Sequence, residues 1–174
     1  GKVGGMVTDL IWETFCLETL AYAYDGLYDY MDDPELIAYL KQKGLPIQSG
    51  DDLRHYIENY ILRAGIEGLL TGYIQGNPGH HQAAAAAVAL VLDDYSESKN
   101  NPFNSAVAVD YIRRYNHAGV VHDSDIMVNG LERDGGGEES PGYCPIKLDF
   151  TRVADLLEMI RARQPKRFPL EQYP

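Results

Sequence analysis

Residues 76–82 form a polar, glycine-flanked segment that carries the side chains of this chain best suited to binding and catalysis. It holds two amides and two imidazoles, those of Asn77, Gln82, His80 and His81. The alanine-rich run that follows predicts an apolar helix, whose N-terminus would offer free N–H groups and the positive end of the helix dipole. Both features favour an anion, so we predict an active-site loop for a substrate that bears a carboxylate.

The elements that position this loop are predicted to be helices, because apolar and aromatic residues recur at helical spacing along most of the chain. The predicted helices cover about residues 8–31, 34–43, 50–73, 80–94, 105–115 and 149–163. No segment alternates convincingly as a strand does. The predicted fold class is therefore all-α, a single domain over residues 1–174 built from antiparallel helix pairs joined by short polar loops.

Two helix boundaries have strong local signals. Asp33 and Pro34 are typical of an N-cap and a first helical position, and Gly44 suits the left-handed position just past a helix end. Residues 119–145 are instead rich in Gly, Asp, Glu and Ser, which predicts a long irregular stretch. Such a stretch in a compact domain is usually a functional loop or a disordered segment.

The composition argues against several classes of partner. Fifteen basic and 26 acidic residues give a formal net charge of −11, the wrong sign for binding a phosphate backbone. No apolar run approaches the roughly 20 residues that a membrane-spanning helix needs. Cys16 and Cys144 are far apart, and adjacent residues such as His80 and His81 point about 100° apart on a helix. We therefore predict neither nucleic acid nor membrane as a partner, and no metal site.

Three motifs, taken in order along the chain, resemble landmarks of a known enzyme family. They are residues 20–29, residues 57–59 together with the 76–82 loop, and residues 134–143. The series is similar to that of the heparinase II/III-like polysaccharide lyases, which include oligoalginate lyases. The resemblance implies part of an incomplete (α/α) toroid of helical hairpins, which in the family is followed by β-sandwich domains. We expect these 174 residues to be a fragment of such an enzyme.

The activity implied by the resemblance is β-elimination in an acidic polysaccharide of the alginate or glycosaminoglycan type. The reaction breaks a 4-linked bond to a uronic acid and leaves a 4,5-unsaturated uronate. It requires a group that neutralises the carboxylate, a base for the C5 proton and an acid for the departing O4. No cofactor is implied for this chain, whereas some relatives carry a metal in the β-sandwich part. The family also implies a periplasmic or secreted enzyme.

Catalytic roles carry over from the family by position. Asn77 matches the asparagine that neutralises the carboxylate, and its amide donates without titrating. His81 matches a histidine that completes the neutralising pair or acts as the base, with His80 as a substitute. Pro78 stands where some relatives have a catalytic histidine. Tyr143 falls where the family places a tyrosine that serves as base, acid or both.

Four further residues are assigned to substrate binding, namely Gln82, Glu139, Tyr24 and Arg133. Sugar rings pack on aromatic faces, but a tyrosine such as Tyr24 also suits the core with its hydroxyl at the wet edge. Arginines would offer an anion a local positive groove, and the candidates are Arg54, Arg63, Arg113, Arg114 and Arg133. In the alternative interpretation Asn77 and Gln82 cap the helix and satisfy the backbone of the loop, and Glu139 is a solvated loop acid.

Two other functions remain open from the sequence. A helical-repeat module that only binds partners would leave Asn77, His81 and Tyr143 scattered. An (α/α) toroid glycoside hydrolase would need two carboxylates beside the scissile bond. The candidates for that pair are Asp93, Asp94 and Glu139. An incomplete toroid would also expose apolar helix faces, through which we expect association into a homo-oligomer.

Overall fold

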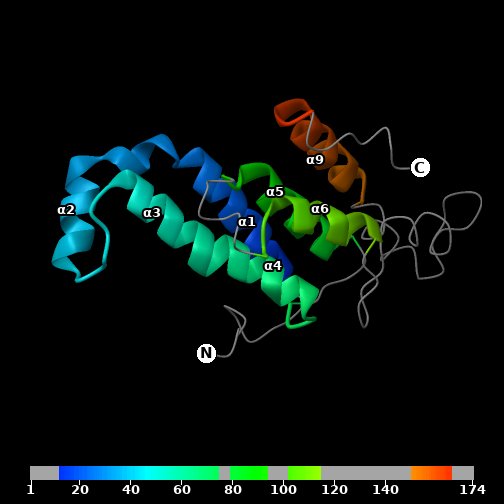
Figure 1. Cartoon of the computed structure of the whole chain (residues 1–174), viewed down its shortest axis with the longest axis horizontal. Helices are drawn as coiled ribbons and strands as arrows, with labels where there is room; N and C mark the ends of the chain where they lie inside the picture. Colours follow the sequence, from blue (N-terminus) through cyan, green and yellow to red (C-terminus); the bar gives the residue numbers. More distant parts are fainter. Residues whose placement is uncertain (1–11, 75–78, 94–101, 115–149, 166–174) are drawn as a thin grey trace, which may run out of the picture.

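The computed structural model describes residues 12–74, 79–93, 102–114 and 150–165. Within these ranges the chain forms helices and no strand, which confirms the predicted all-α class (Figure 1). The elements are α1 (Glu13–Gly26), the 3-10 turn η1 (Asp29–Asp32), α2 (Pro34–Gln42), α3 (Gly50–Ile57), the π-helical turn η2 (Glu58–Leu62), α4 (Arg63–Leu70), α5 (His80–Val91), α6 (Ser105–Arg114) and α9 (Phe150–Arg163). None of the helices in these ranges is long and apolar enough to cross a membrane.

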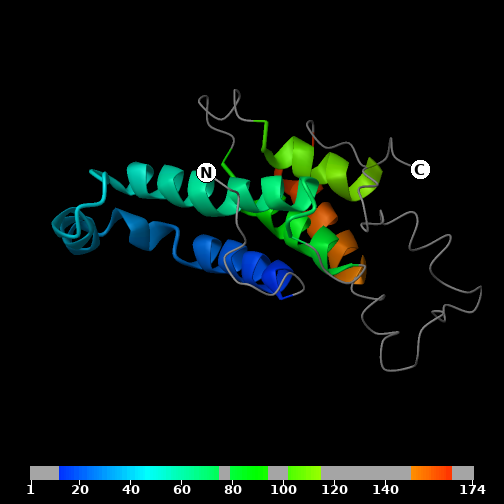
Figure 2. The ribbon, with the colours of Figure 1, turned by 90° about the horizontal axis from the view of Figure 1, so that it is seen from below.

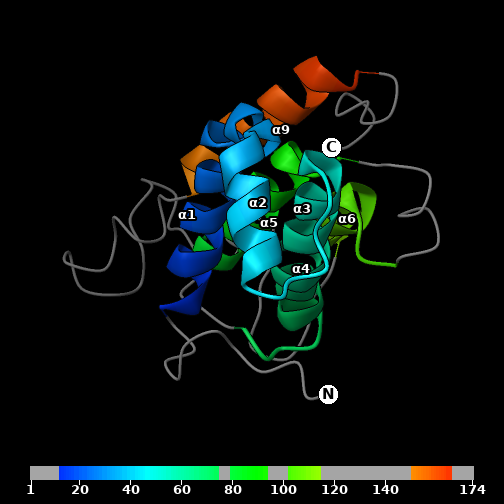
Figure 3. The ribbon, with the colours of Figure 1, turned by 90° about the vertical axis from the view of Figure 1, so that its left-hand side faces the viewer.

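The central element is α5, which packs against α1, α4, α6 and α9. In the end-on view of Figure 3 it lies among these helices, with α2 in front of it. Every residue of α5 is buried except the half-buried Leu90. A helix that is apolar on all sides is stable only when other elements enclose it, and its small alanine side chains let neighbouring helices approach closely. The alanine run therefore accounts for the position of α5 at the centre.

Helices α1 and α5 run parallel and in register. At their first turns the rings of Phe15 and His80 lie 4.4 Å apart. Past their last turns the Tyr28 hydroxyl lies 2.5 Å from the Asp93 carboxylate. The α1–α5 pair thus has an N-terminal end and a C-terminal end. The 12 residues of α5 separate these ends by about 18 Å, at roughly 1.5 Å per residue.

Helices α3 and α4, with η2 between them, form one continuous helical run that returns beside α1 (Figure 2). This agrees with the single helix predicted over residues 50–73, except that a π-helical turn interrupts it at residues 58–62. Gly65 lies where α4 meets α1, since a Cβ atom there would come within 2.7 Å of Leu17 Cδ2. Glycine is needed at this position because Leu17 is fully buried and has little room to move.

The predicted helix over residues 8–31 is wrong beyond Gly26. The backbone N–H of Leu27 still bonds to the Ala23 carbonyl, but α1 ends there and η1 follows. The restart at Asp33 is confirmed, because its Oδ1 accepts hydrogen bonds from the N–H groups of residues 35 and 36 at 2.8 and 2.9 Å. Gly44 ends α2 with a φ of 79°, as its left-handed preference predicts.

Candidate functional site

The N-terminal turn of α5 contains three of the predicted site residues. His80, His81 and Gln82 are 5%, 0% and 1% exposed. The Gln82 Oε1 atom accepts a hydrogen bond of 2.8 Å from the backbone N–H of Gly79, the residue that precedes the helix. This geometry supports the helix-capping alternative for Gln82, since the side chain satisfies a backbone donor of its own helix.

The two imidazoles face different neighbours. The His80 ring lies 4.4 Å from the ring of Phe15 on α1, and Phe15 in turn lies 5.7 Å from the exposed Trp12. The His81 ring meets the edge of Tyr111 on α6 at 6.3 Å. Burial raises the pKa of the Tyr111 hydroxyl. Packing on both sides therefore holds the first turn of α5, and the two rings do not converge on one point.

Several predicted residues lie outside the described ranges, so their positions stay predictions. They are Asn77, Asp94, Arg133, Glu139 and Tyr143. The convergence of Asn77, His81 and Tyr143 is thus not decided by the geometry. Within the described ranges, no group of three or more His, Cys, Asp or Glu side chains is placed to hold a metal ion.

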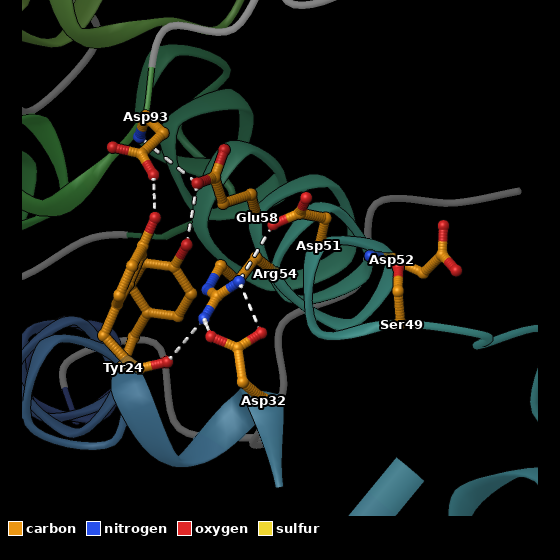
Figure 4. A network of polar contacts seen from close by, with 9 residues as sticks. Tyr24, Asp32, Ser49, Asp51, Asp52, Arg54, Glu58 and Asp93 are labelled. Atoms are coloured by element: carbon orange, nitrogen blue, oxygen red, sulfur yellow. Dashed lines mark hydrogen bonds and ion pairs between the residues drawn. The ribbon is translucent and has the colours of Figure 1, made fainter. Parts of the chain in front are cut away.

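A buried polar network occupies the C-terminal end of the α1–α5 pair (Figure 4). Tyr24 is 3% exposed, and its hydroxyl donates a hydrogen bond of 2.8 Å to Glu58 Oε1. Burial, followed by the neighbouring carboxylate, raises the pKa of this phenol. Of the two interpretations of Tyr24, the described structure supports the core one. Its hydroxyl, however, lies on a buried carboxylate rather than at a wet edge.

Glu58 is the centre of this network. Its Oε1 also accepts the Asp93 backbone N–H at 3.2 Å, and its Oε2 forms an ion pair with Arg63 at 3.1 Å. The side chains of Glu58 and Arg63 are 0% and 1% exposed. Burial raises the pKa of the Glu58 carboxyl, although the three donors oppose that shift. Arg63 donates further to the carbonyls of Asp93 and Phe103, at 3.0 and 2.9 Å.

A second arginine is also committed to internal contacts. Arg54 donates to Asp32 at 2.6 Å, to Asp51 at 2.9 Å and to the Tyr28 carbonyl at 3.0 Å. Its guanidinium lies 4.4 Å from the centre of the Tyr28 ring. The hydrogen bond from Arg54 lowers the pKa of Asp32. The predicted positive groove therefore cannot include Arg54 or Arg63, because both are buried and paired.

Beside the network lies a pocket of about 370 Å³. Its polar lining is Asp25, Tyr28, Asp93 and Arg163, and its apolar lining is Leu90, Val91 and Met159. The Asp93 carboxylate accepts the Tyr28 hydroxyl at 2.5 Å through Oδ2 and Arg163 at 3.0 Å through Oδ1. This hydrogen bond to Asp93, with burial second, raises the pKa of Tyr28 to about 12. Arg163 also donates to the Leu90 carbonyl.

The sequence named Tyr24 as a substrate-binding residue and Asp93 as a hydrolase candidate, but it predicted neither the network nor the pocket to which they belong. Residues 57–59 formed part of a family motif, yet nothing in the sequence paired Glu58 with Arg63. Five positions along an α-helix turn the side chain by about 140°, away from the same face. The π-turn, with its i→i+5 hydrogen bonds, brings the two side chains together. The sequence offered one signal for this pair, namely an acid and an arginine five positions apart inside an apolar run.

The two enzymatic hypotheses occupy opposite ends of α5. The lyase residues His80 and His81 begin this helix, and the hydrolase candidate Asp93 follows its last turn. Neither a scan against protein-family models nor searches of the curated proteins and the solved structures found a match to this chain. The residues and their geometry therefore have to decide between the two ends.

Proposed function

We propose that the chain belongs to a polysaccharide lyase that cleaves a 4-linked uronic-acid polysaccharide of the alginate or glycosaminoglycan type by β-elimination. One observation carries the proposal: residues 79–82, the described part of the predicted loop, form the N-cap and first turn of α5, the most enclosed helix of the described structure. The product is a 4,5-unsaturated uronate. In this proposal the helices belong to an incomplete (α/α) toroid, and the enzyme works in the periplasm or outside the cell.

A firmly held first turn suits the demands of this reaction. The enzyme must hold donors in place for the substrate carboxylate and for the enolate-like charge that develops when the C5 proton leaves. Phe15 packs on His80 and Tyr111 packs on His81, so the end of the loop has little freedom. The N-terminus of α5 also favours an anion at the loop.

The roles follow the order of the motif. Asn77, three positions before α5, donates its amide N–H to the substrate carboxylate and neutralises it. His81 is fully buried, so we assign it to hold the loop. His80 is 5% exposed, so of the two histidines it is the one closer to a substrate at the surface. Tyr143 serves as base for the C5 proton, as acid for O4, or as both. Glu139 and Arg133 bind the polysaccharide.

The two alternative functions are less well supported. A hydrolase would use Asp93, at the other end of α5. A general acid needs a carboxyl that carries a proton, yet both oxygens of Asp93 already accept hydrogen bonds from Tyr28 and Arg163. The packing of His80 and His81 beside a glycine-flanked polar loop gives a binding-only module no evident benefit.

Any homo-oligomer would form through exposed apolar side chains, of which Trp12 and Leu27 are described examples.

The fate of water distinguishes the proposed lyase from a hydrolase. Alginate, heparan sulfate, hyaluronan and pectate would be incubated in water labelled with heavy oxygen, with this chain and with a longer form that adds a downstream β-sandwich part. A lyase yields unsaturated ends without label, because elimination adds no water. A hydrolase would instead leave saturated non-reducing ends and place one labelled oxygen at each new reducing end. Intact polymers with both forms would contradict catalysis of either kind.

A further inference from the structure

The pocket at the C-terminal end of the α1–α5 pair contains one carboxylate that the described residues leave unpaired. Asp93 and Arg163 neutralise each other across 3.0 Å, and the Tyr28 hydroxyl donates its proton to Asp93. The side chain of Asp25, in the last turn of α1, makes no hydrogen bond or ion pair with any described residue, although its backbone carbonyl accepts the Tyr28 N–H at 3.2 Å. Among the described lining residues, the pocket therefore holds one carboxylate without a counter-charge.

Helix ends add to this negative potential. The last turns of α1, α5 and α9 all reach the pocket, since Asp25, Val91 and Arg163 line it. The C-terminus of a helix carries a partial negative charge on its free carbonyls, and it favours a cation nearby. Arg163 already meets this demand at the Leu90 carbonyl, but no described cation faces Asp25. A positive ligand group would complete the arrangement.

The other residues that line the pocket suit a small, partly apolar group attached to the positive charge of the ligand. Leu90 and Val91 from α5 and the exposed Met159 from α9 form an apolar side. The volume of about 370 Å³ falls within the range of roughly 300–1,000 Å³ that is common for small-molecule sites. Tyr28 donates its only proton, so its oxygen is free to accept a hydrogen bond from a ligand.

The pocket is also preformed. The N–H and carbonyl of Asp93 are held by Glu58 and Arg63, so the buried network fixes the backbone that carries the Asp93 carboxylate. Arg54 fixes Tyr28 from the other side through its carbonyl and its ring. Preformed sites lose less conformational entropy when they bind a ligand.

We propose that this pocket binds a small organic ammonium ion, with the ammonium group at Asp25 and the body against Leu90, Val91 and Met159. The site lies about 18 Å from the first turn of α5, at the other end of this helix. It is therefore independent of the lyase proposal. A carboxylate ligand is disfavoured, because the one guanidinium among the described lining residues is already paired with Asp93.

A series of ligands that share one ring and differ in charge tests this proposal. Isothermal titration calorimetry at neutral pH would compare glucosamine, glucose and glucuronate, with cyclohexylamine added to separate an amino sugar from a plain alkylammonium. We expect one or both ammonium compounds to bind about fivefold or more tightly than glucose, and glucuronate to bind most weakly. Equal affinities across the series, or tightest binding by glucuronate, would overturn the proposal.

Two charge-matched variants locate the site. Asp25→Asn should weaken ammonium binding about fivefold, because it removes the proposed partner. Asp29→Asn removes the same charge from an exposed residue that does not line the pocket, and it should leave the affinity unchanged. Equal effects of the two variants would mean attraction to an acidic protein in general and would overturn the site. Asp25 is exposed and unpaired among the described residues, so unchanged circular dichroism is expected for its variant.

Discussion

Glu58 and Arg63 form an ion pair of 3.1 Å in the interior, five positions apart on one continuous helical run. The pair depends on the π-turn at residues 58–62, which brings both side chains to the face that meets α1 and the end of α5. Through it the α3–α4 run is tied to Tyr24 on α1 and to the backbone of Asp93. This pair therefore fixes the geometry at the C-terminal end of the α1–α5 pair.

Replacing Arg63 with methionine should destabilise the fold strongly. The change keeps most of the side-chain volume but leaves the Glu58 carboxylate buried without its counter-ion, which typically costs about 3–5 kcal/mol. The free energy of unfolding from urea titration measures the effect. Arg161→Met is the matched control, since Arg161 pairs with Glu158 at the surface and should contribute no more than about 0.5 kcal/mol. Similar losses in the two variants would contradict the structural role of the buried pair.

The hydrogen bond from Tyr28 to Asp93 should make stability depend on alkaline pH. The pKa of Tyr28 is raised from 10.0 to about 12, so the folded state keeps a proton that the unfolded chain releases between these values. The stabilisation is therefore complete below pH 10 and is lost as the pH rises towards 12.

Comparison with Tyr28→Phe isolates this contribution, because the other tyrosines titrate in both proteins. The wild type should be more stable by about 1 kcal/mol at neutral pH. This difference should shrink when the free energy of unfolding is measured above pH 10. A difference that stays constant or widens at alkaline pH would show that the phenol proton does not bind Asp93.

Gly65→Ala should destabilise the contact between α4 and α1. The new methyl group would overlap the buried Leu17 side chain, and overpacking of this kind typically costs about 1–3 kcal/mol. Gly26→Ala is the control, since a Cβ atom there meets nothing within 4 Å and alanine favours a helix. Thermal unfolding should show a lower midpoint for the first variant and an equal or higher one for the second. The reverse order would refute the close approach of the two helices.

Local chemistry explains which parts of the fold could be predicted from the sequence. Asp33, Pro34 and Gly44 act through their own backbone preferences, so the start and end of α2 agree with the prediction. The alanine run fixes α5 in the same way, because an all-apolar helix has to be enclosed. These signals do not depend on distant residues.

Features that depend on tertiary contacts could not be predicted. Helical periodicity continues past Gly26, yet the chain turns there into η1. The sequence suggested that Arg54 and Arg63 line a groove for anions. In the structure Asp32, distant in sequence, pairs with Arg54, and Glu58 pairs with Arg63 across the π-turn. The sequence allows Gln82 to be either a substrate-binding residue or a helix cap, and its hydrogen bond with the Gly79 N–H in the structure favours the cap.

The most direct test of the lyase proposal is the ultraviolet absorbance of the unsaturated uronate during incubation with the acidic polysaccharide panel. The assay would use whichever form of the protein gives a signal, this chain or one extended by a β-sandwich part. That form would be compared with its Asn77→Ala variant and with a control variant, Gln42→Ala, which changes an exposed residue. We predict that absorbance rises with one polymer, that Asn77→Ala lowers the rate by about 100-fold or more, and that Gln42→Ala keeps it. Absence of any rise in both forms, or full activity of Asn77→Ala, would contradict the proposal.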